Sequence, residues 1–254
     1  MPLRVWNRLL RIGFISTRLQ GTDGVSLETE KWANVLERAG HKCFYFAGVC
    51  DRPPDVCHIT PEAFFQHPEI TYINHVIFNQ PIRPPDVTHR IFELKNLLKA
   101  ELYRFISEFD LELLIAENVL AIPIHLPLGM AIAELVAETG FPVIGHHHDM
   151  FWERKRFLTN CVWDILNSVF PPHMPTIRHV VINSSASNQL ALRTGISSTL
   201  IPNVMDFDNP PPPVDDYARQ VRRDLGLTKD EYLILQPTRI VQRKGIEHAI
   251  DLVS

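Results

Sequence analysis

The 254-residue sequence lacks several patterns that mark common protein classes. Its four cysteines include no CxxC pair, which argues against a zinc ribbon and a thioredoxin-type motif. No apolar run is long enough to cross a bilayer. The formal net charge of −4 gives no reason to expect a nucleic acid as partner. We therefore expect a cytoplasmic protein with free thiols, because isolated cysteines stay reduced in that compartment.

Two further absences concern the beginning of the chain. The loop after the first predicted strand lacks the GxGxxG spacing of a nicotinamide-binding Rossmann enzyme. Residues Met1 to Arg11 lack the uninterrupted apolar stretch of a signal peptide. Arginines are interspersed among apolar residues here, so we expect a lead-in to the first strand. The alternative is weak peripheral contact with an anionic membrane surface.

What is present is an alternation of short apolar runs and amphipathic helices. Buried strands are predicted at residues 10–16, 42–49, 75–79, 111–117, 142–145, 179–183 and 199–204. Between them, helices are predicted near 26–39, 91–105, 128–138, 163–169 and 190–195. The first of these helices is expected to bury Trp32, Val35, Leu36 and Ala39. The alternation predicts an α/β fold with a doubly wound parallel sheet.

Polar residues follow the carboxyl ends of several predicted strands. They are Gly21 to Gly24, Glu117 with Asn118, His146 to Asp149, and Asn183 with Ser184. Open parallel sheets bind ligands at this edge, so we expect one cleft there. A solvated loop is the alternative for the histidine stretch.

The three successive histidines cannot all face the same way. Consecutive strand residues point to opposite faces, so at most two of them share a side. His146 and His148 could thus act with Asp149 as ligands in a metal hydrolase. No further ligand cluster with metal spacing appears, which disfavours that reading.

The organisation of the chain changes near residue 205. Four prolines, Pro210 to Pro213, form a stiff spacer. We predict a first domain at 1–205, a hinge at 206–216 and a second α/β domain beginning at 217–254. The last segment predicts helices at 217–225 and 245–253 and a strand at 232–236. One strand cannot form a covered sheet, so we expect a truncated domain whose strand edge invites pairing with another chain.

Four motifs occur in order along the chain. They are the loop ending Asp23, Gly24, Val25, Ser26; the His148, Asp149 step; the set Ile201, Pro202, Asn203, Asp206; and the set Arg239, Lys244, Gly245. With these motifs the chain resembles the retaining GT-B glycosyltransferases of family four, group one. The resemblance implies a Rossmann-like acceptor-side domain and the start of a donor-binding domain. It also implies transfer of a sugar from a nucleotide sugar to a hydroxyl of a glycan or other acceptor, with no metal ion and no cofactor.

The resemblance assigns roles to particular residues. It implies that His148 and Asp149 are catalytic and that Gly24, Arg239 and Lys244 bind the donor diphosphate. Backbone N–H groups at a glycine and positive side chains suit a diphosphate. The chain departs from the family in having Asp23, where a second glycine is usual.

Four residues are predicted to bind the acceptor. His147 is included because a shift of one residue would turn it toward the cleft in place of His148. Asn118 shares the rim, although a strand-end cap explains it equally well. From their chemistry alone, Trp152 offers a flat face for a sugar ring and Arg154 a cation for a carboxylate or phosphate.

One element of the family is missing. Its Glu-x7-Glu element would stand beyond Ser254, so we expect this chain by itself to be poorly active or inactive. The alternative is a non-catalytic module that binds the acceptor or another protein.

Overall fold

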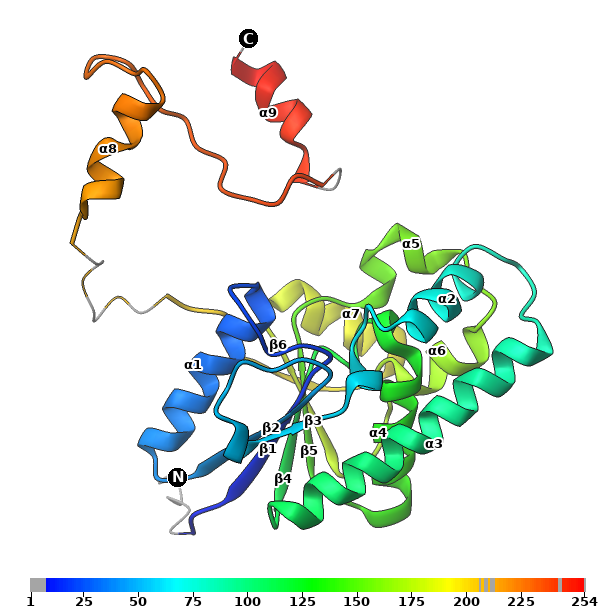
Figure 1. Ribbon diagram of the computed structural model, residues 1–254. Coiled ribbons are helices and arrows are strands. Elements are labelled where there is room, and N and C mark those ends of the chain that lie inside the picture. Colours follow the sequence, from blue (N-terminus) through cyan, green and yellow to red (C-terminus); the bar gives the residue numbers. More distant parts are fainter. Residues whose placement is uncertain (1–7, 206, 208–209, 211–212, 242–243, 254) are drawn as a thin grey trace. The chain divides into compact units, whose positions relative to one another are not determined.

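The computed structural model describes residues 8–205, 207, 210, 213–241 and 244–253 (Figure 1). Two compact units result, Met1–Val204 and Met205–Ser254. Asp206 of the third motif lies outside the described residues, as do residues 1–7, which hold most of the segment considered for membrane contact. Among the described helices, none has both the length and the apolar character needed to span a bilayer.

A parallel sheet of seven strands organises the first unit. The strands are β1 (Arg11–Ile15), β2 (Lys42–Ala47), β3 (Cys57–Ile59), β4 (Leu113–Glu117), β5 (Val143–His147), β6 (Ile177–Val181) and β7 (Ser198–Leu200). Their order in the sheet is β3-β2-β1-β4-β5-β6-β7. The predicted α/β fold with a doubly wound parallel sheet is confirmed.

Helices cover both faces of this sheet. Figure 1 shows α1 (Gly24–Arg38) on one face and α3 (Pro85–Glu108) and α4 (Leu126–Thr139) on the other. The remaining α-helices of this unit are α2 (Pro68–Ile77), α5 (Lys155–Leu158), α6 (Trp163–Val169) and α7 (Ser184–Thr194). Strand alternation sends Leu114 into the core under α3 and α4, and Ile115 into the core under α1. The same alternation decides which polar residues meet at the edge.

The third strand is not where the sequence predicted it. The apolar run at 75–79 belongs mostly to α2, whose buried residues Ile70, Ile73 and Ile77 are spaced for one helical face. Pro68 at the first helical position suits the start of this helix. The third strand is β3, inside a stretch for which the sequence predicted neither a strand nor a helix. Prolines flank this strand on both sides. With three residues, it is too short to show the alternation of buried and exposed residues that marks a strand.

Helix α1 buries only part of the face predicted from its sequence. Trp32 and Leu36 pack against the core under this helix, as predicted. Val35 is 56% exposed, whereas Glu28, Thr29 and Ala33 are buried. Burial of the two polar side chains is possible because both have partners. The Glu28 carboxylate pairs with Lys31, and the Thr29 hydroxyl donates to the Val25 carbonyl. The stripe of apolar residues therefore predicted part of the contact face and missed its buried polar residues, Glu28 and Thr29.

The second unit contains α8 (Asp216–Asp224) and α9 (Ile246–Val253). The strand predicted at 232–236 does not form, because no neighbouring strand in the described residues offers it backbone hydrogen bonds. No described residue of this unit is buried.

Candidate functional site

The candidate site lies at the carboxyl ends of β4 and β5. The strand order reverses between β1 and β4, and ligands of doubly wound sheets bind near such a reversal. The register of the β4–β5 pair sets Glu117 opposite His146. His147, the next residue of β5, then points to the opposite side of the sheet. Asn118 follows the last residue of β4 and begins the loop.

Three titratable side chains meet on the α1 side of the sheet. The Oε2 atom of Glu117 lies 2.9 Å from Nδ1 of His146 and 3.4 Å from Nε2 of His148. The two imidazole ring centroids are 4.6 Å apart. The indole of Trp32, from α1, stacks on His146 with 4.3 Å between centroids. Glu117 and His146 are buried, and the His148 side chain keeps 12% of its surface exposed. Within this cluster, solvent reaches His148.

The charge of this cluster follows from its contacts. Burial opposes ionisation of Glu117, but the hydrogen bonds and charges of His146 and His148 outweigh it and lower the pKa of the carboxyl group. Glu117 is therefore an anion at neutral pH. A buried carboxylate with two imidazole partners holds both rings in a fixed orientation.

His147 lies on the opposite side of β5. It is 1% exposed, and its Nε2 lies 2.8 Å from Nδ1 of His179 on β6. Burial lowers the pKa of His147 well below its usual range and the pKa of His179 to about 4. This neutral, buried pair does not favour the predicted contact of His147 with an acceptor, whereas His148 reaches the surface.

Asn118 joins the two strand ends. Its backbone has φ of 61°, a left-handed conformation that asparagine tolerates better than most residues. The side-chain oxygen accepts a hydrogen bond from the His148 backbone N–H at 3.1 Å, and the amide donates to Asp149 at 3.2 Å. Asn118 thus caps the strand ends, which was the alternative to acceptor binding.

Asp149 and Arg154 form an ion pair. The Arg154 Nε–H donates to Oδ2 of Asp149 at 2.8 Å, and Nη2 contacts the same oxygen. Asp149 is therefore held by Asn118 on one oxygen and by Arg154 on the other. Asp149 directly follows His148 in the chain, and the charge of Arg154 is already paired with it.

Trp152 is packed rather than open. It contacts two apolar clusters of the first unit, and the Arg193 guanidinium carbon lies 5.3 Å from the centroid of its ring. Its indole N–H is buried and has no hydrogen-bond partner in the part of the chain that the structure describes. A sugar ring would have to displace Arg193 to stack on that face.

Gly24 begins α1 and is exposed. A side-chain atom added at Gly24 would meet no other atom within 4 Å, so packing does not require glycine here. The Asp23 carboxylate accepts from the backbone N–H groups of Val25 and Ser26. A donor phosphate at this helix end would compete with the Asp23 cap.

Arg239 and Lys244 belong to the second unit, where both are exposed. Their backbones are tied into one turn region by the hydrogen bonds from Val241 N–H to the Arg239 carbonyl and from Lys244 N–H to the Val241 carbonyl. The pair therefore presents two cations from a short segment.

Sequence reasoning missed the centre of the site. Glu117, and not Asp149, completes the set of two histidines and a carboxylate, and the ligand atoms of this set lie within 4.8 Å of one another. Glu117 was placed on the rim, but its pairing with His146 depends on the register between two strands distant in sequence. The contacts of Trp32 with His146 and of His179 with His147 were missed for a similar reason. Trp32 belongs to α1 and His179 to β6, and both lie far in sequence from the histidines that they contact.

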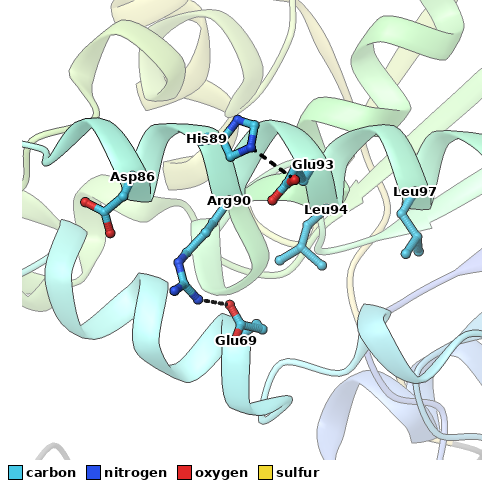
Figure 2. Close-up of a pocket in the computed structure, with 7 residues that line it drawn as sticks. All are labelled: Glu69, Asp86, His89, Arg90, Glu93, Leu94 and Leu97. Atoms are coloured by element: carbon cyan, nitrogen blue, oxygen red, sulfur yellow. Dashed lines mark hydrogen bonds and ion pairs between the residues drawn. The ribbon is translucent and has the colours of Figure 1, made fainter.

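A separate pocket lies between α2 and α3 (Figure 2). Four of its polar lining residues are paired, because Arg90 binds Glu69 and His89 binds Glu93, and Asp86 completes the polar lining. It shares no residue with the histidine cluster.

Comparison with curated proteins finds two relatives, both named mannosylglucosylglycerate synthase. The protein of Thermotoga maritima is 34% identical over 249 residues, and that of Petrotoga mobilis is 32% identical over 256 residues. The chain is homologous to glycosyltransferases. Each match covers 96% of this chain and 56% of the relative, so the chain spans a little over half the length of these relatives. No protein-family model matches it.

Proposed function

We propose that this chain forms the acceptor side of a retaining GT-B glycosyltransferase that moves a hexosyl group from a nucleotide sugar to an acceptor hydroxyl. The observation that carries the proposal is the similarity to two mannosylglucosylglycerate synthases across nearly the whole chain. The partly exposed His148 at the carboxyl edge of the sheet supports it. By analogy with the relatives' names, mannose is the first sugar to test and glucosylglycerate the first acceptor.

In this proposal, His148 binds the reacting sugar. Glu117 holds Nε2 of the ring, which leaves the other nitrogen, Nδ1, to a sugar hydroxyl. Asn118 fixes the His148 backbone through its side-chain oxygen. The cluster therefore fixes the orientation of the His148 ring before the substrate binds. This favours catalysis, because the ring does not have to be ordered during the reaction.

The reaction itself is proposed to need no metal ion or cofactor. The bond between the sugar C1 and the donor diphosphate breaks as the acceptor oxygen bonds to C1 from the same face. The acceptor proton passes to a diphosphate oxygen. Arg239 and Lys244 stabilise the negative charge that develops on the leaving group, as cations do in such transition states.

A hybrid enzyme tests this function. The region of the Thermotoga maritima relative that matches this chain is replaced by the chain, and transfer from nucleotide-activated mannose to glucosylglycerate is followed by mass spectrometry and NMR. We expect transfer with the donor's anomeric configuration retained. A folded but inert hybrid beside an active relative would refute the proposed activity, and an inverted product would refute retention alone.

The donor contact has its own test in the hybrid. Lys244→Ala should lower turnover roughly 100-fold or more, since it removes a charge from the diphosphate, and should leave folding intact. Lys229→Ala is the matched control, because Lys229 is an exposed lysine of the same unit outside the motif. Equal turnover of the two variants would remove Lys244 from the site.

A further inference from the structure

We propose that Glu117, His146 and His148 bind a divalent transition-metal ion such as Zn²⁺, and that the bound ion blocks sugar transfer. The binding half stands on the geometry of the cluster. The blocking half rests on the proposed function, because it assumes that His148 binds the sugar.

The ligand atoms are already spaced for a metal ion. The three candidate atoms lie within 4.8 Å of one another, and the Glu117 oxygen lies 2.9 Å and 3.4 Å from the two ring nitrogens. In a tetrahedral site with bonds of about 2.0–2.1 Å, neighbouring ligand atoms are roughly 3.3 Å apart. Small shifts of these side chains would therefore complete three coordination bonds.

The cluster is held rigid by its surroundings. Glu117 and His146 are paired in register on neighbouring strands, and Trp32 stacks on the His146 ring. Within the described residues, the second carboxylate oxygen, Oε1 of Glu117, is buried without a hydrogen-bond partner. An unsatisfied buried oxygen of an anion favours a cation beside it. This orphan oxygen is a second observation, independent of the spacing, that points to a ligand.

The chemistry of the set selects the class of metal. Two imidazoles and one carboxylate suit Zn²⁺, Fe²⁺, Co²⁺ or Ni²⁺, whereas Mg²⁺ and Ca²⁺ prefer oxygen ligands. Three protein ligands leave a fourth coordination position open. The exposed 12% of the His148 side chain gives the ion a route from solvent.

A bound ion would compete with the sugar. It would use Nε2 of His148 and the negative charge of Glu117, which in the free protein hold the ring for the substrate. A metal bond at Nε2 leaves Nδ1 as an N–H donor, so a sugar hydroxyl that donates its proton to Nδ1 in the free protein would lose its acceptor. Zinc should therefore inhibit transfer, and a chelator should restore it.

The binding test uses the 254-residue chain without a histidine tag and with no sugar present. Zn²⁺ is titrated by calorimetry, and Co²⁺ by its visible absorption, which reports a tetrahedral site. We expect one ion per chain and a loss of affinity of roughly 100-fold or more in Glu117→Gln and His148→Asn. His89→Asn is the matched control, since His89 and Glu93 form an exposed pair on α3 (Figure 2).

Several results would overturn the site. Binding that is equal in wild type and His148→Asn, or binding abolished by His89→Asn, would assign the ion to another place. Folding is checked by thermal unfolding. Zn²⁺ should raise the melting temperature of the wild type and leave that of His148→Asn unchanged. Because His148 is the least buried of the three ligands, this variant keeps the test decisive even if Glu117→Gln unfolds.

Inhibition is measured separately in the hybrid enzyme. Micromolar Zn²⁺ should lower transfer, and excess chelator should restore it. Zinc that binds in the calorimeter but leaves transfer unchanged would refute the blocking half. A hybrid that is inert without zinc would refute the proposed function and leave the binding result standing.

Discussion

The two sides of β5 use the same residue type in opposite ways. On the α1 side, His146 and His148 share the carboxylate of Glu117, and the cluster reaches solvent through His148. On the other side, His147 pairs with His179 and is sealed from water. Burial keeps His147 neutral, whereas the two rings on the α1 side have an anion as their partner. The comparison shows that environment, and not residue type, separates a solvent-reached histidine beside an anion from a buried neutral one.

The largest expected difference between the two sides is in turnover. In the hybrid enzyme, His148→Ala should lower kcat roughly 100- to 1000-fold because it removes the proposed sugar contact. His147→Asn should lower kcat less than about 10-fold per folded molecule, since it acts only through packing. Steady-state kinetics with active-site titration measure both. If His147→Asn were the more damaging change, the assignment of the two sides would be reversed.

Stability should respond next most strongly to the loss of Glu117. Glu117→Ala leaves one buried and one half-buried ring without their anion, and we expect it to lower the free energy of unfolding by about 3 kcal/mol at pH 7. Glu93→Ala, which removes an exposed carboxylate on α3, should cost less than about 0.5 kcal/mol. Urea unfolding followed by circular dichroism compares them. Equal costs would mean that the cluster contributes nothing to folding.

The two sides should also lose stability in different pH ranges. The folded pKa of His179 is about 4, below its ordinary 6.5, so the unfolded state takes up protons first as the pH falls. The free energy of unfolding should therefore decrease between about pH 6.5 and 4, by roughly 2 to 3 kcal/mol for this residue. Glu117, whose pKa is also lowered, should add its loss only below about 4.5.

A double variant isolates that effect. His147→Leu with His179→Leu removes both partners at once, so no polar atom of the pair is left unsatisfied. Its stability should change less between pH 6.5 and 4 than that of the wild type. A residual slope is expected from His125, whose pKa burial also lowers to about 4. Urea unfolding at a series of pH values gives both slopes, and identical slopes would contradict the buried neutral pair.

The smallest effect is expected at Asn118, which supports the α1 side only. Asn118→Ala loses two side-chain hydrogen bonds and strains a backbone at φ of 61°, and should cost about 1 kcal/mol or more. Asn118→Gly loses the same hydrogen bonds without the strain and should be more stable than Asn118→Ala by roughly 0.5 kcal/mol. Thermal unfolding ranks the variants. An equal or lower stability of the glycine variant would argue against backbone strain.

Much of this site follows from local rules of the chain. Strand alternation alone predicted that His146 and His148 share one side, and the order of strands and helices predicted the edge at which Glu117 stands. The contacts between side chains at that edge could not be predicted, because the contact between Glu117 and His146 depends on the register of β4 against β5. The apolar stripe of α1 predicted that Trp32 faces the core, but the stacking of Trp32 on His146 depends on how α1 is rotated on the sheet.

The errors in the fold have a similar cause. The run at 75–79 is as apolar as a strand, but only the helical spacing from Ile70 to Ile77 shows what it joins. The run at 232–236 has the composition of a strand and lacks neighbours in the described residues. The composition of a short apolar segment therefore predicts that it is buried. Whether it forms a helix or a strand depends on the segments that pack against it.

Gly145 has a consequence for how this sequence can evolve. A side-chain carbon there would lie 2.9 Å from Cε1 of His147 and 3.5 Å from Nδ1 of His179. The bare backbone at Gly145 is thus part of the histidine pair, although it contributes no polar atom. Positions 145, 147 and 179 should mutate as a linked trio. A lineage that acquires alanine or serine at 145 should show smaller residues at one of the other two.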